Sequence, residues 1–551
     1  MKSAARILLL CGCLYGCAHT PPYPPQEPLL HDPDRRPFRA KLEPYYTSGE
    51  WDFIEKSYLR PVTRFLAVDP GGEALNINAL DEVPKSSWFD HRVDRMTAEN
   101  FALGPCDSSE LKLAGTRIVA GKPDGVYPGF LIKDGEGTRY MVKVDGGIQG
   151  PHNSSADVVG SRLYHAAGFD VPCNRVVRIE RSALKVDPKA KMDRIDGTET
   201  RMVEADVDEI LARGQRGPDG TWRAVASRYL EGRPLGPWRY HGTREDDRND
   251  IVPHEDRREL RGARLMAAWT NHWDSREQNT LAMWVETRPG EGYVRHHLLD
   301  FGDCFGTFAG ATALIVKRRG HVHWFEPGQL LSDFATLGLI QRPWDEAKLG
   351  PTGPFLGYYD VELFDPESWS PNYPNPAFGR MTERDAAWMA RIIAQMDEQD
   401  VRAAVSAARV DQRIADEWVR VLMGRREKIL NRYLTRLSAL AQPTLVGSGG
   451  NTSICARDLA FDTGIAKDRR YRVRIALDGA WDTSTASMPV VDTAGRVCVR
   501  LPSSGDASAQ RPVYLGVEVL TDNRESGSAR FHVYQKGPTS YLLSGVERLE
   551  P

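Results

Sequence analysis

The sequence predicts an α+β protein in which a β-rich segment precedes a helical one and a separate all-β domain follows. Three observations support this class. Residues 116–146 read as three short strands with glycine-rich turns, and several segments between residues 254 and 437 have the apolar spacing of helices. Beyond residue 442, apolar and polar side chains alternate as in half-buried strands. With 551 residues, the chain is expected to form two or three hydrophobic cores.

The N-terminus is predicted to be a targeting segment rather than part of the fold. A positively charged start precedes the apolar residues 7–14, and Leu14-Tyr15-Gly16-Cys17 resembles a bacterial lipobox. The resemblance implies a lipoprotein signal peptide over residues 1–16, a lipid anchor on Cys17 and attachment to a membrane of the cell envelope. Alanine at position 18 favours the outer membrane by the same resemblance. An ordinary secretion signal is the alternative.

Two further segments precede the β-rich region. Residues 17–37 are rich in proline and are expected to form a stiff, extended tether. Residues 38–110 carry aromatic side chains without a clear period, which indicates an extension packed on the domain that comes after it. The five cysteines after Cys17 include no CxxC pair, which argues against a zinc site and against a dense disulfide scaffold. An oxidising compartment would permit one bridge, for which Cys455–Cys498 is the candidate.

Composition excludes some classes of function. Hydrophobic residues make up 41% and charged residues 27% of the chain, which is typical of globular proteins. The net charge is -3, and no basic stripe is interleaved with aromatics, so a nucleic-acid partner is not expected. After residue 20, no apolar stretch is long enough to span a membrane.

The β-rich region is predicted to contain three strands, a helix and two more strands. TRIVAG, PGFLIKDGEG and RYMVKVDG are the first three, and Asp134-Gly135 is a hairpin signal. Residues 154–168 have apolar side chains at helical spacing, and Gly168 is placed to end the helix. VPCNRVVRIE and AVASRYLEG are the later strands.

The helical region comes next. Residues 254–272 place Leu260, Ala263, Ala267 and Thr270 on one face, and most of their arginines are expected on a solvated face. A capping box beginning at Thr382 opens a helix through Met396, and another runs from about residue 413 to residue 437. From Gln442 the composition changes to proline, glycine and serine, so residues 442–551 are predicted to be a sandwich-like domain. We find no chemistry in this domain.

Two polar phrases in the helical region carry candidate chemistry: NHWDSREQNT, residues 271–280, and LLDFGDCFG, residues 298–306. A phosphoryl-transfer site needs a cation on the nucleotide phosphates, a carboxylate to orient the attacking hydroxyl and oxygen ligands for magnesium. Lys143 supplies the cation, and Asp274, Asn279 and Asp300 supply the oxygens.

These residues resemble the motifs of protein kinases, in kinase order. His272 to Asn279 has the H-x-D-x-x-x-x-N spacing of the catalytic loop, and Asp300-Phe301-Gly302 resembles the magnesium-binding DFG. Lys143 stands where kinases have the lysine of the third strand, and Asp157 lies near the position of its helical glutamate partner. The segment from Ser227 to Gly232 resembles the adenine-reading hinge, with Arg228, Tyr229, Leu230 and Glu231 as its residues.

The resemblance covers about residues 110–440 and is nearest to atypical kinases of the HipA and phosphoinositide-kinase types, and to a group of uncharacterised bacterial envelope proteins. It implies a two-lobed domain, with a β-rich N-lobe over residues 111–232 and a helical C-lobe over residues 233–441. It also implies ATP and Mg²⁺ as cofactors. Lys143 would hold the α- and β-phosphates, Asp274 would act as base or orienter, and Asn279 and Asp300 would hold magnesium.

The chain departs from the kinase pattern at several places. No G-x-G-x-x-G precedes Lys143, and the nearest loop is residues 121–125. Trp273 stands where kinases usually have an arginine, which argues against control by a phosphorylated activation loop. No APE phrase follows the DFG.

The leading hypothesis is an envelope-anchored, ATP- and Mg²⁺-dependent kinase-like phosphotransferase whose acceptor is a protein, a lipid headgroup or a sugar. Because a lipoprotein facing the periplasm or the exterior meets little ATP, a catalytically inactive pseudokinase or binding scaffold is the first alternative. A metal-dependent hydrolase using Asp274, Asp300 and His272 is the second.

Each site residue also has an alternative interpretation without chemistry. Lys143 would then be an exposed strand lysine and Asp157 a surface residue of a helix. Asp274 and Asn279 would only cap a turn. Asp300 would be a turn residue before a glycine. For Asp303, assistance to the metal is one interpretation, but a solvated loop aspartate is expected.

Overall fold

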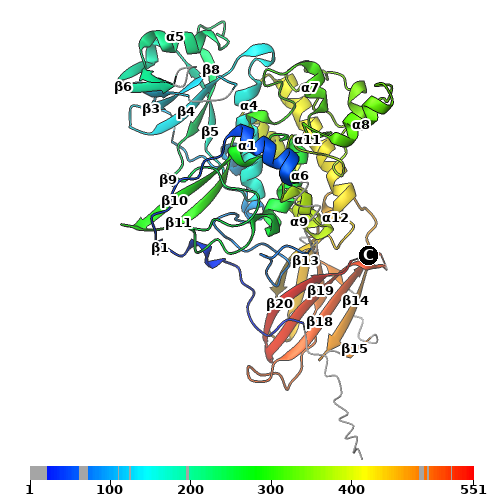
Figure 1. Ribbon diagram of the computed structural model, residues 1–551. Helices are drawn as coiled ribbons and strands as arrows, with labels where there is room; N and C mark the ends of the chain where they lie inside the picture. The colour runs from blue at the N-terminus through cyan, green and yellow to red at the C-terminus, as the bar shows by residue number, and fades with distance from the viewer. Residues whose placement is uncertain are drawn as a thin grey trace, which may run out of the picture. The chain divides into compact units, whose positions relative to one another are not determined.

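The computed structural model describes residues 22–60, 72–109, 111–122, 126–193, 198–478, 480–482, 489–492, 495–522 and 524–550. Cys17 and the predicted signal peptide lie outside these residues. None of the helices within the described ranges has both the length and the apolarity that crossing a bilayer requires. The predicted mixed α+β class is confirmed, with several sheets and many helices (Figure 1).

The chain separates into two compact units. Among the described residues, the larger comprises those of 29–441 and 458–469 together with Glu550, and the smaller comprises those of 22–28, 442–457 and 470–549. The return of residues 458–469 to the larger unit includes the short helix α12 (Leu459–Asp462), whose Leu459 amide donates to the Ala439 carbonyl. The composition change at residue 442 therefore marks the point where the chain passes from the larger to the smaller unit, but it does not reveal the return of residues 458–469.

A seven-stranded sheet forms the β-rich part of the larger unit. Its strand order is β5-β8-β4-β3-β2-β6-β7, and β3 and β4 form the predicted hairpin. Two strands and one helix lie between β5 and β8, where the sequence predicted none. The elements are β2 (Arg117–Gly121), β3 (Gly129–Lys133), β4 (Arg139–Val144), β5 (Asn174–Ile179), β6 (Lys185–Asp193), β7 (Glu199–Arg201), α5 (Glu204–Ala212) and β8 (Trp222–Arg228).

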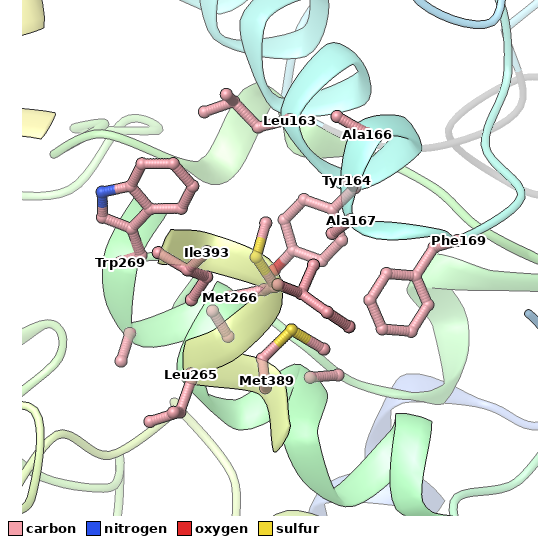
Figure 2. Packing of buried hydrophobic residues seen from close by; sticks show 14 of the residues in the cluster. Leu163, Tyr164, Ala166, Ala167, Phe169, Leu265, Met266, Trp269, Met389 and Ile393 are labelled. Carbon is pink, nitrogen blue, oxygen red and sulfur yellow. The ribbon is translucent and has the colours of Figure 1, made fainter. Parts of the chain in front are cut away.

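Helix α4 (His152–Ala167) confirms the predicted helix between β4 and β5 and ends at Gly168, whose φ is 116°. Nearly all of its residues are buried. In Figure 2, Leu163 and Tyr164 of α4 meet Trp269 of α6 (Arg258–Thr270) and Met389 of α9 (Glu383–Ala394) in one apolar cluster. Helix α4 thus contacts strands β5 and β8 of the seven-stranded sheet as well as helix α6.

A second sheet in the larger unit has the order β1-β11-β10-β9. Its centre is a long hairpin of β10 (Thr280–Arg288) and β11 (Glu291–Leu298). The edge strands are β1 (Phe38–Arg39), from the predicted extension, and β9 (Arg233–Pro234). Gly290 in the turn has a φ of 72°, which glycine adopts without strain. This hairpin, with its turn at Pro289-Gly290, was not among the predicted elements.

The predicted helices of residues 254–272, 382–396 and 413–437 are confirmed as α6, α9 and α11 (Gln412–Tyr433), each within a few residues of the expected bounds. The remaining helices were not predicted. They are α1 (Gly49–Ile54), α3 (Ala98–Leu103), α7 (Ala313–Arg318), α8 (Pro327–Ala335) and α10 (Glu398–Ser406).

The prediction that most arginines of α6 lie on a solvated face is wrong. Arg258 and Arg261 are fully buried, because Asp385 of α9 lies between them with carboxylate oxygens 3.3 Å and 3.4 Å from their guanidinium nitrogens. Asp81 and Asp256 pair with the outer nitrogens of the same two arginines. Charged residues at helical spacing do not reveal a partner carboxylate that lies far away in the sequence.

Replacing Asp385 with alanine is expected to lower the free energy of unfolding by about 3–5 kcal/mol, because two guanidinium groups would stay buried with fewer partners. Urea unfolding of the variant and the unmodified chain measures this difference. Asp416→Ala is the control. It removes a carboxylate from an ion pair with Arg402 in which both side chains are exposed to solvent, so stability should stay nearly unchanged. Equal stabilities of the two variants would contradict the role given to Asp385.

The predicted extension, residues 38–110, packs on the larger unit. Phe38 lies edge-on against Trp284 of β10, with ring centroids 5.3 Å apart. A disulfide joins Cys106 to Cys173 at the entrance to β5, in addition to the predicted Cys455–Cys498 bridge, so the described chain has two bridges rather than one. Asp34 is buried and accepts from the Ser87 amide at 2.8 Å, so the proline-rich segment is already packed before residue 38.

The smaller unit is built from β-strands in two antiparallel sheets, with orders β12-β13-β17-β16 and β15-β14-β18-β19-β20. The disulfide lies within the first sheet, where Cys455 and Cys498 are opposite each other. Tyr23 packs here, with its carbonyl accepting from Tyr534 at 2.6 Å. The strands are β12 (Leu440–Val446), β13 (Ser453–Asp458), β14 (Tyr471–Leu477), β15 (Ala480–Asp482), β16 (Val490–Val491), β17 (Arg496–Arg500), β18 (Val513–Thr521), β19 (Arg524–Gly537) and β20 (Ser540–Arg548).

Candidate active site

The β10–β11 hairpin brings the two polar phrases together. Thr280 at the start of β10 pairs with Leu298 at the end of β11. One residue further out, the Leu299 amide donates to the Asn279 carbonyl at 2.9 Å. The phrase that ends at residue 280 and the phrase that begins at residue 298 therefore meet at the same end of one hairpin, although 17 residues separate them in the sequence.

Lys143 is held between two carboxylates. Strand β4 carries it, and its Nζ lies 2.6 Å from Oδ2 of Asp157 on α4 and 2.7 Å from Oδ1 of Asp300. Lys143 and Asp157 are both buried, at 8% and 1% exposure. Neither is the exposed residue of the alternative interpretation. The structure thus joins the sheet, α4 and the hairpin end through one ammonium group.

Two glycines explain why an aspartate is long enough at position 157. A Cβ on Gly160 would lie 2.5 Å from Cβ of Phe301, and a Cβ on Gly302 would lie 2.3 Å from Oδ1 of Asn153 on α4. Any larger residue would push the Asp300 turn away from the helix. Because the approach is this close, Asp157 reaches Lys143 with Oδ2 and accepts from the Gly302 amide at 3.0 Å with Oδ1.

The charges of these three groups depend on one another. Burial alone would lower the pKa of Lys143, but Asp157 and Asp300 outweigh it and raise that pKa. The Asp300 side chain is 44% exposed, and burial of the remainder opposes its ionisation, yet Lys143 holds its pKa below the usual value. Burial raises the pKa of Asp157 against the attraction of Lys143. An ammonium beside an ionised Asp300 is therefore the state expected at neutral pH.

Asp274 and Asn279 lie in one buried turn. The Asn279 side-chain nitrogen donates to the backbone carbonyl of Asp274 at 2.8 Å and to the side-chain Oδ2 of Asp274 at 3.0 Å. Asn279 thus closes the turn, as the alternative interpretation proposed, but its amide oxygen takes no part in doing so. Burial raises the pKa of Asp274, and Arg276, with Nε 3.1 Å from Oδ1 of Asp274, opposes this rise. Sequence reasoning missed Arg276, which sits within the catalytic-loop phrase itself.

Asp303 is not the solvated loop residue that was expected. It is half-buried in the short helical turn Phe301–Asp303. Burial, Asp300 and Asp274 together raise its pKa well above the usual value. Within the described ranges, no hydrogen bond or ion pair reaches its carboxylate. Arg319 and Lys143 act in the opposite direction and lower the pKa of Asp303, but their effects are smaller than those of burial, Asp300 and Asp274.

Side chains with the oxygen ligands that a divalent cation prefers lie on both phrases that meet at this hairpin end. Asp300, Asp303 and the amide oxygen of Asn279 are hard ligands of the type that Mg²⁺ and Mn²⁺ prefer. A dication would also relieve the repulsion that raises the pKa of Asp303. The residues present therefore fit a metal, with Asp300 and Asn279 as the predicted ligands and Asp303 as an additional one.

The predicted hinge connects the two sheets of the larger unit. Arg228 ends β8, next to the strand of Lys143, and its side chain pairs with Asp107. The Tyr229 amide donates to the Arg139 carbonyl at 3.0 Å, and its side chain is 45% exposed. Leu230 and Glu231 follow, and the chain then turns at Gly232, where a Cβ would lie 2.3 Å from the Trp284 carbonyl oxygen. These four residues lie together, but their side chains are not directed to the Lys143 cluster by any described contact.

His272 has a structural environment. Its Nδ1 lies 3.3 Å from the hydroxyl of Tyr164 on α4, and Phe301 packs between the two elements with its ring 5.4 Å from the imidazole. Burial lowers the pKa of His272 to about 4, so it is neutral at neutral pH. It supports the turn that carries Asp274, and the contacts do not give it the ligand role that a hydrolase would need.

The loop between β2 and β3 faces the same site. Lys122 and Val126 are its described ends, and Tyr127 follows Val126, since residues 123–125 lie outside the described ranges. Lys122 is close enough to Asp300 to lower the pKa of that carboxyl, after the larger effects of burial and Lys143. The Tyr127 hydroxyl lies 3.3 Å from the Thr307 hydroxyl in the segment after the Asp300 turn. A lysine and a tyrosine thus flank this loop in place of the glycine-rich sequence of kinases.

The N-terminal extension contacts the catalytic loop directly, which the sequence did not predict. Lys56 lies in a single π-helical turn after α1, and its Nζ is 2.7 Å from Oε1 of Glu277, a loop residue between Asp274 and Asn279. Both side chains are 3% exposed. No local pattern could have revealed this pair, because the two residues are 221 positions apart.

Asp52 of α1 is buried beside this pair. Its carboxylate oxygens are both without a hydrogen-bond partner, and burial followed by repulsion from Glu277 raises its pKa to about 6. Asp52, Glu55 and Glu277 have oxygens within 4.8 Å of one another. Lys56 donates to the last two at 2.7 Å each and so already provides a cation for the group.

Asp52→Asn is expected to stabilise the protein at pH 8 by about 2 kcal/mol and to have little effect near pH 4. The folded state keeps the proton up to a pKa of about 6, whereas the unfolded chain loses it near 3.8, so the carboxyl lowers the free energy of unfolding as pH rises through this window. Urea unfolding of both proteins at the two pH values measures the difference. A variant that is less stable at pH 8 would show that Asp52 is needed as an anion beside Lys56.

Comparisons with known proteins found structural neighbours but no matching family model and no matching curated sequence. No protein-family model matches the chain, and no curated protein matches its sequence. Two crystal structures of Golgi casein kinase, one with Mn and ADP bound, are structural neighbours at 10% sequence identity. They cover 65% and 71% of this chain and 92% and 93% of their own chains, each with a TM-score of 0.24. A TM-score of this size supports no inference about activity.

Proposed function

We propose that this protein is a kinase-like phosphotransferase that uses ATP and a divalent metal, Mg²⁺ in the simplest case, to phosphorylate a hydroxyl group. One observation carries the proposal. The hairpin end places Asp300 against Lys143, which is itself paired with Asp157, while Asn279 and Asp274 lie at the other side of the same hairpin end. A cation, two metal ligands and a separate carboxylate are the parts that phosphoryl transfer requires.

Each residue has one role in the proposed reaction. Lys143 binds the α- and β-phosphates, and Asp157 holds its ammonium group in place. Asp300 and Asn279 hold the metal, with Asp303 as a further ligand, and the metal supplies charge neutralisation between the phosphates. The hinge residues Arg228 to Glu231 bind the adenine.

Asp274 acts on the acceptor. The acceptor oxygen attacks the γ-phosphorus and forms the new O–P bond as the bond from that phosphorus to the β,γ-bridging oxygen breaks. ADP leaves, and the hydroxyl proton passes to Asp274. Burial supports this role because it raises the pKa of Asp274 toward that of a useful base.

The cellular address is a further part of the proposal. The lipobox-like segment ending at Cys17 supports a lipid anchor on that cysteine and attachment to the outer membrane. Intact mass spectrometry of the membrane-extracted protein tests it, since a chain beginning at Cys17 with added acyl mass is expected. A water-soluble chain cut elsewhere would exclude the anchor.

Thermal unfolding with nucleotide tests the proposed function. Millimolar Mg-ATP is expected to raise the melting temperature of the unmodified chain by several degrees, about the effect of ligand at a hundred times its Kd. Asp300→Ala should abolish this rise because it removes the metal ligand that also holds Lys143. Asp416→Ala, a carboxylate loss on the surface, is the matched control and should keep the rise. No shift of the unmodified chain would favour the scaffold alternative.

A further inference from the structure

A cavity of about 290 Å³ adjoins the catalytic loop at Trp273. Trp273 directly precedes Asp274, and Asp274 is close enough to Arg319, another lining residue, to act on the charge of that guanidinium. Among its lining residues are Arg318, Arg319, His323 and Trp324 from the segment that follows the Asp300 turn. We call this cavity the Trp273 pocket. None of the functions assigned so far to Lys143, Asp300 or the hinge uses it.

The walls of the Trp273 pocket are fixed to the catalytic loop. The Asn372 amide donates to the Trp273 carbonyl at 2.6 Å, and the Trp324 amide donates to the Asn372 carbonyl at 2.7 Å. The Arg319 guanidinium lies 3.9 Å from the centre of the Trp273 ring. Gly320 has a φ of 86°, and a Cβ there would lie 2.3 Å from Oδ1 of Asn271. The pocket is therefore formed before any ligand binds, which lowers the entropy cost of binding.

The pocket offers positive charge without a matching carboxylate. Arg318 bonds to the Gln329 side-chain oxygen at 3.3 Å, and Arg319 bonds to the Thr307 carbonyl. In the ranges that the structure describes, neither arginine has a carboxylate oxygen within 4 Å, and no Asp or Glu is among the residues lining the pocket. Asp274 and Asp303 are near enough to act on the charge of Arg319 but do not pair with it.

Unsatisfied hydrogen-bond donors occur on the same residues. Nε1 of Trp273, Nε of Arg318 and Nε of Arg319 are buried N–H groups without an acceptor. Leaving such donors unpaired is costly. They are enclosed by protein, and they add to the excess of donors over acceptors around the pocket. A ligand that brings acceptors and negative charge therefore suits these walls.

Apolar surface lies beside these donors. The Trp324 side chain is 53% exposed, and Ile315 and Val322 also line the pocket. A flat indole with aliphatic neighbours fits the C–H face of a sugar ring, and the volume suits a single ring with one substituent. An extended acidic peptide would use the arginines but would leave this apolar wall without a partner.

We propose that the Trp273 pocket binds an anionic sugar, a pyranose carrying a phosphate or carboxylate, as the phosphoryl acceptor. The anionic group lies on Arg318 and Arg319, the ring lies against Trp324, and a ring hydroxyl faces Asp274. The role as acceptor rests on the proposed function, whereas binding of the sugar does not depend on nucleotide. His323, whose Nδ1 lies 2.8 Å from the Pro371 carbonyl, adds a polar contact at the rim.

Isothermal titration calorimetry of the purified full chain, without nucleotide, tests the binding. D-glucose 6-phosphate and D-glucuronate are expected to bind at least about tenfold more tightly than D-glucose. Arg318→Gln should remove that preference, and Trp324→Ala should weaken all three sugars. Arg402→Gln removes the same charge from an exposed ion pair with Asp416 and should change nothing. Because Trp324 is exposed, its variant is expected to fold even if Arg318→Gln does not.

Two outcomes would overturn the proposal. One is equal affinity for glucose and its charged derivatives in the unmodified chain. The other is binding of a serine peptide with flanking glutamates that competes at the pocket while the sugars do not bind. Failure of the proposed function gives a different result. Sugar would bind in a way that needs Arg318, but no phosphoryl group would be transferred from Mg-ATP. The pocket would then remain an anionic-sugar site, and only the catalytic role would be wrong.

Discussion

Asp274→Asn is expected to reduce phosphoryl transfer by about a thousandfold, which is within the range that a general base contributes. Asparagine has the same shape and keeps an oxygen for the Asn279 side-chain nitrogen, so the turn that holds the metal ligand should stay closed. It cannot accept the acceptor's proton as a carboxylate does. Asp274 contacts neither Lys143 nor Asp157, so nucleotide affinity should change little.

The measurement has two parts. Transfer from radiolabelled ATP to D-glucose 6-phosphate gives the rate, and calorimetric titration with Mg-ADP gives nucleotide affinity. The expected result is a large fall in the first and a change of less than about threefold in the second. Asp416→Asn is a surface control of the same chemistry. Equal rates in Asp274→Asn and the unmodified chain would remove Asp274 from the mechanism, and bound nucleotide without any transfer in either protein would favour the pseudokinase scaffold.

Much of the site could be predicted because its residues lie in two short phrases. The spacing from Asp274 to Asn279 fits a turn closed by a side-chain amide, and that is the bond observed. The return to Asp300 is explained by a hairpin whose turn, Pro289-Gly290, is a recognisable signal. The order of strands and helix around Lys143 and Asp157 followed from hydrophobic periodicity alone. These features are local, or depend on one simple topology.

Other features could not be predicted because their cause lies far along the chain. Lys56 and Glu277 form a buried pair across 221 positions, and a lysine in a segment without periodicity gives no sign of such a partner. The arginines of α6 look like surface residues until Asp385 is placed between them. Asp303 looks solvated in the sequence, and only the folded turn shows that it shares its surroundings with Asp274 and Asp300. Long-range electrostatics thus accounts for most of what the local pattern omitted.

The close packing of α4 depends both on local sequence and on contacts between residues that lie far apart along the chain. Gly160 and Gly302 have no motif that marks them, yet their missing side chains set the distance at which Asp157 meets Lys143. A glutamate in place of Asp157 would need about one more methylene of space in a region where neighbouring atoms are already in contact. The shorter side chain at position 157 therefore still reaches Lys143 because the glycines around it allow a close approach.

Lys143→Met is expected to lower the free energy of unfolding by about 3–5 kcal/mol and to abolish detectable transfer. Methionine fills the space but leaves Asp157, which is 1% exposed, as a buried carboxylate without its cation. Asp300 should suffer less, because 44% of its side chain is exposed and water can solvate it. Urea unfolding measures the stability, and the ATP transfer assay measures the activity. Lys191→Met, in an exposed pair with Glu199 on the same sheet, is the matched control.

The double variant Lys143→Met/Asp157→Asn separates the two effects. Asparagine removes the buried charge yet keeps an oxygen that can accept from the Gly302 amide, so more than half of the lost stability should return. Transfer should not return, because the phosphates would still lack their cation. If stability fails to recover, the loss in the single variant comes from packing rather than from an unpaired Asp157. If transfer recovers together with stability, Lys143 serves the fold alone and the phosphate-binding role assigned to it is wrong.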